Sequence, residues 1–399
     1  MSRRATVLVV VVALLVVLVV VVLTTTSEHG GGPVTPGGQV PATVSSSVTT
    51  PGQSSVIVAM GHLDDPSNTF WELFLRRAGS PTWVLATPPG VATNGGLVAS
   101  VPVGGPLTAG FLTSADLTFS PVAATTDDGA TWNPGQLPGA LVPRPDALAW
   151  GPPGTTAAVV ATSGQTLETS SGDLDDWRPT VTSSALAPVS SDCHLQALTA
   201  VAFDVSDVPV VGATCTDTDR VGLFAPAQAS SSSVAGPWRS VGPPVAGGLD
   251  KVGSSVLRLD ATSAGLAGLV QVTSPTGTTM NAIWEQGVLG RWFQSGAPSV
   301  PSGWTLLATG IGGGGGSGAT VLLGRGYRRV VAVIPGPGHP WSVSPPAPDG
   351  ASAVATVGDE TDAFVSDNSV LTVWAWSPGS TSWRHAAAIT VAIPYGSSN

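Results

Sequence analysis

The sequence contains few charged residues and hardly any lysine. Asp, Glu, Lys and Arg together make up 10% of the 399 residues, Lys251 is the one lysine, and the formal net charge is −10. A protein that binds nucleic acid neutralises phosphates with clustered Lys and Arg side chains. Because the arginines are scattered along this chain, the sequence excludes nucleic acid as a partner.

Cysteine is almost absent as well. Cys193 and Cys215 are the two cysteines, and they flank two apolar, β-type runs joined by the polar stretch DVSD. A hairpin would bring its open ends together, and a disulfide closing a loop of about 21 residues stabilises a fold by about 3 kcal/mol. His194 is the only histidine nearby and no CxxC spacing occurs, so a metal site is disfavoured. We predict a structural disulfide formed in an oxidising compartment, and neither a metal nor a cofactor.

The composition leaves little room for long helices. The chain has 50 Gly and 35 Pro, and inside a helix each Gly costs about 1 kcal/mol and each Pro about 3 kcal/mol relative to Ala. Disordered chains can share this composition, but they lack the 42% hydrophobic content and the 13 Trp found here. Many short strands joined by Gly and Pro turns fit better, so we predict an all-β fold.

One long stretch carries no charge at all. Residues 7–23 form an unbroken apolar run directly after Arg3, Arg4 and two small residues. Seventeen helical residues span about 26 Å, near the lower limit for crossing a bilayer, and the run exceeds the apolar core of a usual signal peptide. No small-x-small cleavage motif follows, so we predict a signal anchor, with a cleaved signal peptide as the alternative. By the positive-inside rule, residues 1–6 form a cytoplasmic tail and the rest of this single-pass membrane protein lies outside.

The next stretch, residues 24–54, contains no aromatic residue and consists mostly of Thr, Ser, Gly, Pro and Val. This composition is typical of a flexible linker, which would reach about 30 Å from the membrane. The sequence therefore predicts a folded domain over residues 55–396 that is connected to the membrane helix by this linker.

A tryptophan that follows a glycine by a few residues recurs throughout the predicted domain. The steps between successive markers are 42–61 residues and average 50. Runs such as TAAVVAT and ATVLLG lie between them and are typical of strands buried on both faces. This period predicts a β-propeller of seven four-stranded blades, with six or eight blades or two β-sandwiches as alternatives. The markers are Trp83, Trp132, Trp177, Trp238, Trp292, Trp341 and Trp383.

The two ends of this domain predict how the ring closes. The domain begins with about three strand-like stretches and ends with one more, AAAITVAIP, after Trp383. We therefore expect the last strand to complete the first blade, because this arrangement would remove an open sheet edge.

The stretch TTDDGATW, residues 125–132, places two carboxylates side by side. Asp127 can accept hydrogen bonds from backbone N–H groups of its own turn, and Gly129 can supply the positive φ that a tight hairpin needs. Thr131 and Trp132 would then begin an outer strand, with the indole covering a junction between blades. We predict a structural turn rather than a catalytic pair of carboxylates.

This stretch resembles the Asp-box of the sialidase and BNR-repeat propellers, whose motif is S/T-x-D-x-G-x-T-W. Thr125, Asp127, Gly129, Thr131 and Trp132 fill every motif position, and Asp128 occupies a free one. The stretch SSGDLDDW at residues 170–177 is a degenerate version, and the other five markers keep only Gly followed by Trp. The resemblance implies a propeller in which the box joins the two outer strands of a blade, away from the central channel where substrates bind.

The catalytic residues of the sialidases are poorly matched. Those enzymes need three arginines, a Tyr–Glu pair and an Asp, and their early arginine motif is absent, with Arg76 and Arg77 as its nearest counterpart. Tyr327 lies among Arg325, Arg328 and Arg329, which we interpret as a solvated strand end. Two-carboxylate glycosidase chemistry stays open because 25 acidic residues are present.

The sequence gives little support for other catalytic or binding motifs. The sequence has no HExxH and no GxSxG, and the glycine run 310–318 lacks the GK[ST] of a P-loop. Trp374 and Trp376 alternate on one strand face and could stack a sugar ring, although packing between blades is favoured. We predict a membrane-anchored extracellular propeller that binds or scaffolds a protein or glycan partner, with no catalytic residues. The alternative is a sialidase-like glycoside hydrolase.

Overall fold

A computed structural model describes most of the chain beyond residue 41. The chain divides into two compact units, Met1–Gly38 and Gln39–Asn399, and all described residues belong to the second. They are residues 42–50, 55–62, 69–88, 95–99, 107–112, 120–137, 147–151, 156–161, 164–171, 177–190, 192–227, 236–245, 252–262, 265–286, 291–295, 299–312 and 318–391. The predicted tail 1–6, the predicted span 7–23 and the linker as far as residue 41 lie outside this set. Within it, no helix has the length and apolar character needed to cross a membrane.

The described residues form antiparallel sheets whose strands follow one another in chain order. The first four-stranded sheet contains β1 (Thr43–Thr49), β2 (Ser55–His62), β3 (Thr69–Arg76) and β4 (Val84–Leu85). The second contains β5 (Gly95–Ala99), β6 (Leu107–Leu112), β7 (Ser120–Thr125) and β8 (Asn133–Leu137). The third contains β9 (Ala147–Trp150), β10 (Thr156–Ala161), β11 (Thr166–Ser171) and β12 (Trp177–Thr182). Two further sheets contain β22 (Thr305–Ile311), β23 (Ala319–Arg325), β24 (Arg328–Ile334) and β25 (Ser342–Val343), and β26 (Ala351–Val357), β27 (Glu360–Asp367), β28 (Val370–Trp376) and β29 (Arg384–Thr390).

Between these groups lies a nine-stranded sheet made of two successive meanders. The first contains β13 (His194–Phe203), β14 (Pro209–Thr218), β15 (Leu223–Pro226) and β16 (Trp238–Ser240), and the second β17 (Val252–Thr262), β18 (Gly265–Ser274), β19 (Gly277–Gln286), β20 (Arg291–Ser295) and β21 (Ser299–Val300). They join because β14 pairs with β17. Two short helices, α2 (Ser183–Leu186) and η1 (Ala187–Val189), precede β13.

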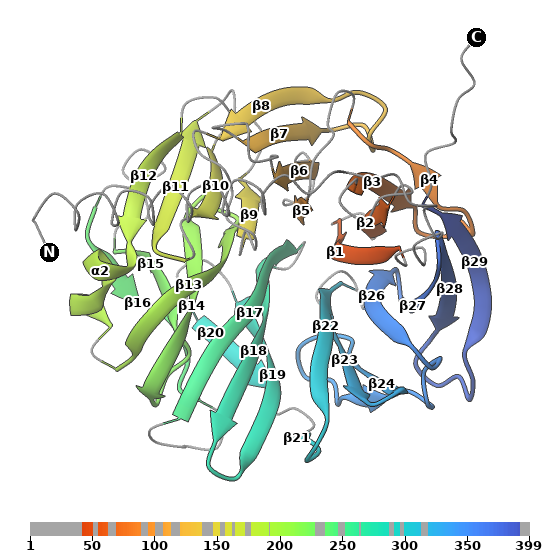
Figure 1. The fold of residues 1–399 in the computed structure, drawn as a ribbon. Coiled ribbons are helices and arrows are strands. Elements are labelled where there is room, and N and C mark those ends of the chain that lie inside the picture. The colour runs from red at the N-terminus through yellow and green to blue at the C-terminus, as the bar shows by residue number, and fades with distance from the viewer. Residues whose placement is uncertain are drawn as a thin grey trace, which may run out of the picture. The chain divides into compact units, whose positions relative to one another are not determined.

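The first strands of the meanders are arranged in a ring. β1 contacts β5, β5 contacts β9, and the series continues through β13, β17, β22 and β26 back to β1. Figure 1 shows the meanders radiating outward from these inner strands, with β1 beside β26 where the ring closes. This radial arrangement of antiparallel sheets is a β-propeller, so the predicted all-β propeller is confirmed.

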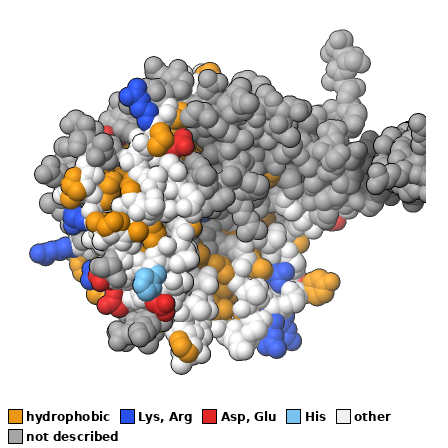
Figure 2. Space-filling view, turned by 60° about the vertical axis from the view of Figure 1, so that its left-hand side comes forward, with side chains coloured by type: hydrophobic (Ala, Val, Ile, Leu, Met, Phe, Trp, Pro, Cys, Tyr) orange, Lys and Arg blue, Asp and Glu red, His pale blue; other side chains and the backbone are white. Residues whose placement is uncertain are grey.

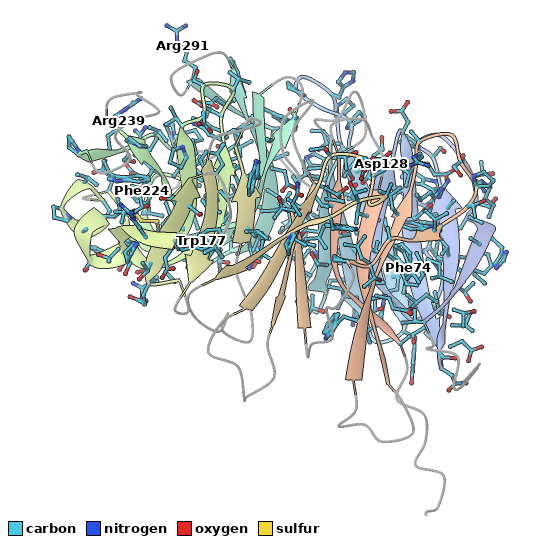
Figure 3. The ribbon with its side chains drawn as sticks, turned by 90° about the horizontal axis from the view of Figure 1, so that it is seen from above. Phe74, Asp128, Trp177, Phe224, Arg239 and Arg291 are labelled. Atoms are coloured by element: carbon cyan, nitrogen blue, oxygen red, sulfur yellow. A yellow bond between two sulfur atoms is a disulfide. The ribbon has the colours of Figure 1, made fainter. Side chains whose placement is uncertain are left out.

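The hydrophobic core lies between neighbouring sheets, because most strands are buried on both faces. In β23, Val321 packs into a cluster with Leu269 of the preceding meander, whereas Leu322 packs into a different cluster with Val354 of the following sheet. Fully burying one such side chain stabilises the fold by about 1.5–3 kcal/mol. Figure 3 shows Trp177 and Phe224 among the sheets, whereas Arg291 projects away from them.

The ring closes differently from the prediction that the last strand would complete the first blade. β29 pairs with β28 in its own sheet, and the first sheet is completed by β1, which lies inside the predicted linker. The Ser47 hydroxyl donates to the Val354 carbonyl at 2.8 Å and the Thr49 hydroxyl to the Thr356 carbonyl at 2.9 Å. Residues 43–49 (TVSSSVT) resemble a linker because they lack aromatics, but their hydroxyls and the β-branched residues at both ends suit a strand that bridges two sheets.

Candidate functional site

The turn at residues 125–132 lies between β7 and β8, the two outer strands of its sheet. Asp127 accepts hydrogen bonds from the Thr131 backbone N–H at 2.8 Å, the Thr131 hydroxyl at 2.6 Å and the Thr125 hydroxyl at 2.7 Å. These hydrogen bonds lower the pKa of Asp127 to about 2, with the Thr131 hydroxyl contributing most. The Gly129 N–H donates to the Thr125 hydroxyl at 3.0 Å, and Asp128 and Gly129 take φ values of 56° and 84°.

The two neighbouring carboxylates therefore belong to separate interactions. Asp127 is held within its own turn, whereas Asp128 is exposed and pairs with Arg77 of the first sheet at 2.9 Å. A two-carboxylate hydrolase needs one carboxyl group with a raised pKa, and the Asp127 pKa is shifted in the opposite direction. The geometry is that of a folding device rather than an acid–base pair.

The marker tryptophans occupy one equivalent place in every meander. Each lies next to or at the beginning of an outer strand, and each of the six other than Trp177 packs into a hydrophobic cluster that links neighbouring meanders. Trp132, for example, contacts a cluster that includes Val56 of the first sheet and Ala109 of the second. The outer strands are β4, β8, β12, β16, β20, β25 and β29. Their tryptophans lie directly before the strand or at its first or second residue, and are Trp83, Trp132, Trp177, Trp238, Trp292, Trp341 and Trp383 respectively.

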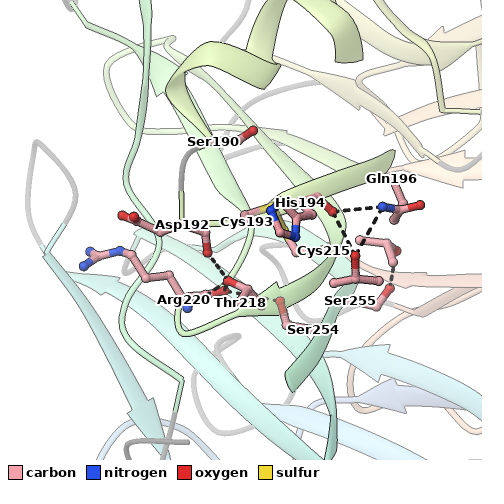
Figure 4. Close-up of a disulfide and its surroundings, with 12 residues drawn as sticks. Ser190, Asp192, Cys193, His194, Gln196, Cys215, Thr218, Arg220, Ser254 and Ser255 are labelled. Atoms are coloured by element: carbon pink, nitrogen blue, oxygen red, sulfur yellow. Dashed lines mark hydrogen bonds between the residues drawn. A yellow bond between two sulfur atoms is a disulfide. The ribbon is translucent and has the colours of Figure 1, made fainter. Parts of the chain in front are cut away.

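The predicted disulfide is confirmed. Cys193 lies just before β13 and Cys215 lies within β14, with their Cα atoms 5.2 Å apart (Figure 4). The hairpin between them turns at DVSD, where the Asp204 carboxylate accepts from the Ser206 and Val208 N–H groups. His194 is exposed, and the described residues contain no cluster of three or more His, Cys, Asp or Glu that could hold a metal ion.

The arginines and the tyrosine considered for sialidase chemistry lie in different parts of the ring and have different partners. Arg77 pairs with Asp128, whereas Tyr327 lies in the turn between β23 and β24 and is 81% exposed. Its neighbour Arg329 folds back and donates to the carbonyls of Ala351 and Gly326. These groups do not converge on one site.

Arg76 instead joins a charged cluster between the first and last sheets. Its guanidinium contacts Asp362 and, at 2.7 Å, Glu360, which in turn pairs with Arg384. Burial raises the pKa of Asp362 to about 6, and the charge of Arg76 acts in the opposite direction. This cluster was not predicted from the sequence. The available signal was the Glu360-x-Asp362 spacing, which places both carboxylates on one face of a strand.

A raised carboxyl pKa next to a second carboxylate could indicate general acid catalysis. A cavity of about 310 Å³ adjoins this cluster and is lined by Arg76, Glu360 and Arg384, among others. However, Asp362 is 0% exposed and does not line that cavity, so its carboxyl cannot reach a substrate there. The cluster is a structural connection between the two sheets.

A small cavity lies among the inner strands. The cavity lined by the inner strands has a volume of about 160 Å³, below the range of about 300–1,000 Å³ typical of ligand pockets. Arg258 of β17 lies in its lining, where it pairs with Asp260 at 2.8 Å, donates to the Thr309 carbonyl at 3.3 Å and contacts the Ser47 carbonyl. One guanidinium thus ties β17, β22 and β1 together across the channel.

A wide, open groove lies on the last sheet. It has a volume of about 780 Å³ and is bordered by the segment leading into β26, by β27 and β28, and by the turn before β29. Trp374 lines this groove and is half-buried, whereas Trp376, with 2% exposure, packs between sheets. The expectation of packing between blades therefore holds for Trp376 but not for Trp374. We name this cavity the tryptophan groove, with Pro345, Asp349, Asp367, Thr372, Trp374 and Trp383 among its lining residues.

The surface around the ring carries few charges, as the sequence predicts. On the face drawn in Figure 2, the Lys, Arg, Asp and Glu side chains that are described are few and scattered. The described side chains form no continuous basic surface on this face.

Comparisons with known proteins show the fold alone. No protein-family model and no curated protein matches the sequence. A solved structure from Lactobacillus plantarum is 12% identical, with a TM-score of 0.52, over 84% of this chain and 96% of its own. The β-propeller domain of Cps50 (Swd1) from Myceliophteria thermophila is 9% identical, with a TM-score of 0.46, over 84% and 99%. A prolyl endopeptidase is 12% identical, with a TM-score of 0.46, over 89% of this chain, which spans about half (51%) of that protein.

Proposed function

We propose that this protein is a membrane-anchored, outward-facing β-propeller that binds a protein or glycan partner without catalysing a reaction. The tryptophan groove carries the proposal, because it combines two half-buried indoles with two exposed carboxylates in a volume of about 780 Å³. Ligand sites of this size usually combine aromatic walls with a few polar groups. The groove is larger than the cavity of about 160 Å³ among the inner strands.

The finer architecture is part of the same proposal. Seven inner strands in a ring, each followed by a meander with a tryptophan at its outer strand, support seven four-stranded blades. The hydrogen-bonded turn at Asp127 supports an Asp-box of the BNR-repeat type. The apolar run 7–23 supports a transmembrane anchor with residues 1–6 in the cytoplasm, a linker that is shortened to residues 24–41, and a cell-membrane location.

Two measurements on the full chain test this function. Protease added to intact cells should remove the propeller, because the domain faces outward; an intact propeller inside the cells or a soluble secreted form would contradict the anchor. Fluorogenic sialosides and neutral glycosides should not be hydrolysed. A turnover that disappears in Asp127→Ala or Glu360→Gln, with the fold retained, would instead establish the glycoside hydrolase.

A further inference from the structure

The tryptophan groove has the charge pattern of a site for a cation. Asp349 and Asp367 lie on its border, and no described Lys or Arg lines it. The whole chain has a net charge of −10, so its field attracts cationic partners and repels anionic ones. A nucleic acid or an acidic glycan would meet repulsion at this groove.

The two carboxylates of the groove have no ion-pair partner among the described residues. Asp128 pairs with Arg77 and Asp260 pairs with Arg258, both within 2.9 Å. Asp349 has no ion-pair partner among the described residues, and Asp367 receives only a hydrogen bond of 3.3 Å from the Asn368 amide. Both carboxylates are exposed, so a bound cation could reach them without displacing an existing ion pair.

The two indoles of the groove are held in fixed positions. Trp383 packs on the buried Trp376 with ring centroids 6.0 Å apart and an interplanar angle of 31°, and its Nε1 donates to the Pro345 carbonyl at 3.2 Å. Trp374 meets His385 edge-on, with centroids 5.7 Å apart. Rings that are already ordered lose little entropy on binding, and the face of an indole attracts a guanidinium or ammonium group.

Each end of the described chain is hydrogen-bonded to the last sheet. Ala42, where the described chain begins, accepts a hydrogen bond from Ser366 in the groove, and Val391, where it ends, donates to the Ser369 carbonyl. Neither residues 24–41 nor residues 392–399 contain a Lys or Arg. We take the occupant that complements this charge to be a second molecule.

The geometry points to an arginine-bearing segment of a partner protein as the ligand of the tryptophan groove, an inference that rests on the proposed binding function. A guanidinium is planar, so it can stack on an indole while its N–H groups donate to a carboxylate. Trp374 supplies the stacking surface, and Asp349 and Asp367 supply the acceptors. A neutral glycan would use the indoles but would gain nothing from the charge of two unpaired carboxylates.

Peptide binding to the full chain in detergent micelles tests this inference. The probe is a fluorescent peptide, Gly-Ser-Arg-Pro-Arg-Ser-Gly, and its matched control has glutamine in place of both arginines. The arginine peptide should bind more tightly than the glutamine peptide, and its affinity should fall as salt is raised. Equal affinities, or no binding of the arginine peptide at millimolar concentration, would overturn the inference.

Matched variants locate the binding on the protein. Asp349→Asn and Trp374→Ala should each weaken binding of the arginine peptide about five-fold. This change corresponds to about 1 kcal/mol of binding free energy for an exposed contact to a cation. Asp219→Asn removes the same charge from an exposed carboxylate outside the groove and should leave the affinity unchanged. Equal effects of Asp349→Asn and Asp219→Asn would show attraction by net charge alone and refute a specific site.

A neutral oligosaccharide, chitotetraose, separates this inference from the broader function. If chitotetraose binds in a Trp374-dependent way while the arginine peptide does not bind, the groove is a glycan site. In that case the arginine inference fails and the proposed binding function stands. If neither probe binds and the glycosides are hydrolysed, the proposed function fails as well.

Discussion

Replacement of Asp362 by asparagine should remove a specific part of the pH dependence of stability. Asp362 is fully buried beside Arg76, and burial raises the pKa of its carboxyl from 3.8 to about 6. Between these two pH values the folded state binds more protons than the unfolded state. The stabilisation from this group is therefore fully present below pH 4 and is lost as the pH rises through 6.

The magnitude follows from the size of the pKa shift. A rise of about two units, from 3.8 to about 6, corresponds to about 3 kcal/mol at 1.36 kcal/mol per unit. Of this, about 1 kcal/mol falls between pH 7 and pH 5. Burial likewise raises the pKa values of Glu72, Glu168 and Asp204, so the wild-type profile alone cannot isolate Asp362.

The assay is urea unfolding of the full chain, followed by tryptophan fluorescence at pH 5, 6 and 7. When the pH is lowered from 7 to 5, the free energy of unfolding of the wild type should rise by about 1 kcal/mol more than that of Asp362→Asn. Asp128→Asn, which changes an exposed and ion-paired carboxyl, should behave as the wild type does. Parallel profiles for the wild type and Asp362→Asn, or a relative loss of wild-type stability on acidification, would refute this reasoning.

Three further outcomes are expected from the same structure. Cys193→Ser/Cys215→Ser should lower the unfolding free energy by about 3 kcal/mol, and thiol labelling of denatured, unreduced wild type should find no free thiol. Asp127→Ala should lower the melting temperature, because three donors lose their acceptor, whereas Asp128→Gly should change it little, since φ is 56° there. Gly129→Val should lower the melting temperature strongly, because φ is 84° and a Cβ would lie 2.8 Å from that of Ala86; an unchanged melting temperature would exclude this packing.

The propeller could be predicted because its signals repeat along the chain. Tryptophans such as Trp238 and Trp292 mark the outer strands at a period of about 50 residues, and apolar runs such as residues 319–323 are buried on both faces. The disulfide could be predicted because Cys193 and Cys215 bracket one hairpin. These features are local, so their spacing along the sequence determines which groups meet.

The closure of the ring and the tryptophan groove depend on contacts between distant residues. Ser47 and Val354 are 307 positions apart, and nothing in the composition of residues 43–49 separates a strand from the linker before it. Arg76 and Asp362 are 286 positions apart, and no sequence motif indicates that they are in contact. Trp374 and Trp376 look equivalent on one strand face, and only the packing of the neighbouring sheet buries one and leaves the other half-exposed.

The central claim, an outward-facing propeller with an open groove, is tested most directly by one engineered thiol. Ser382 is an exposed residue of the tryptophan groove, and both native cysteines are bonded to each other, so Ser382→Cys introduces the single free thiol. A membrane-impermeant maleimide added to intact cells should label this variant and not the wild type. Labelling that requires permeabilised cells, or that fails on the native protein yet succeeds after denaturation, would contradict the account.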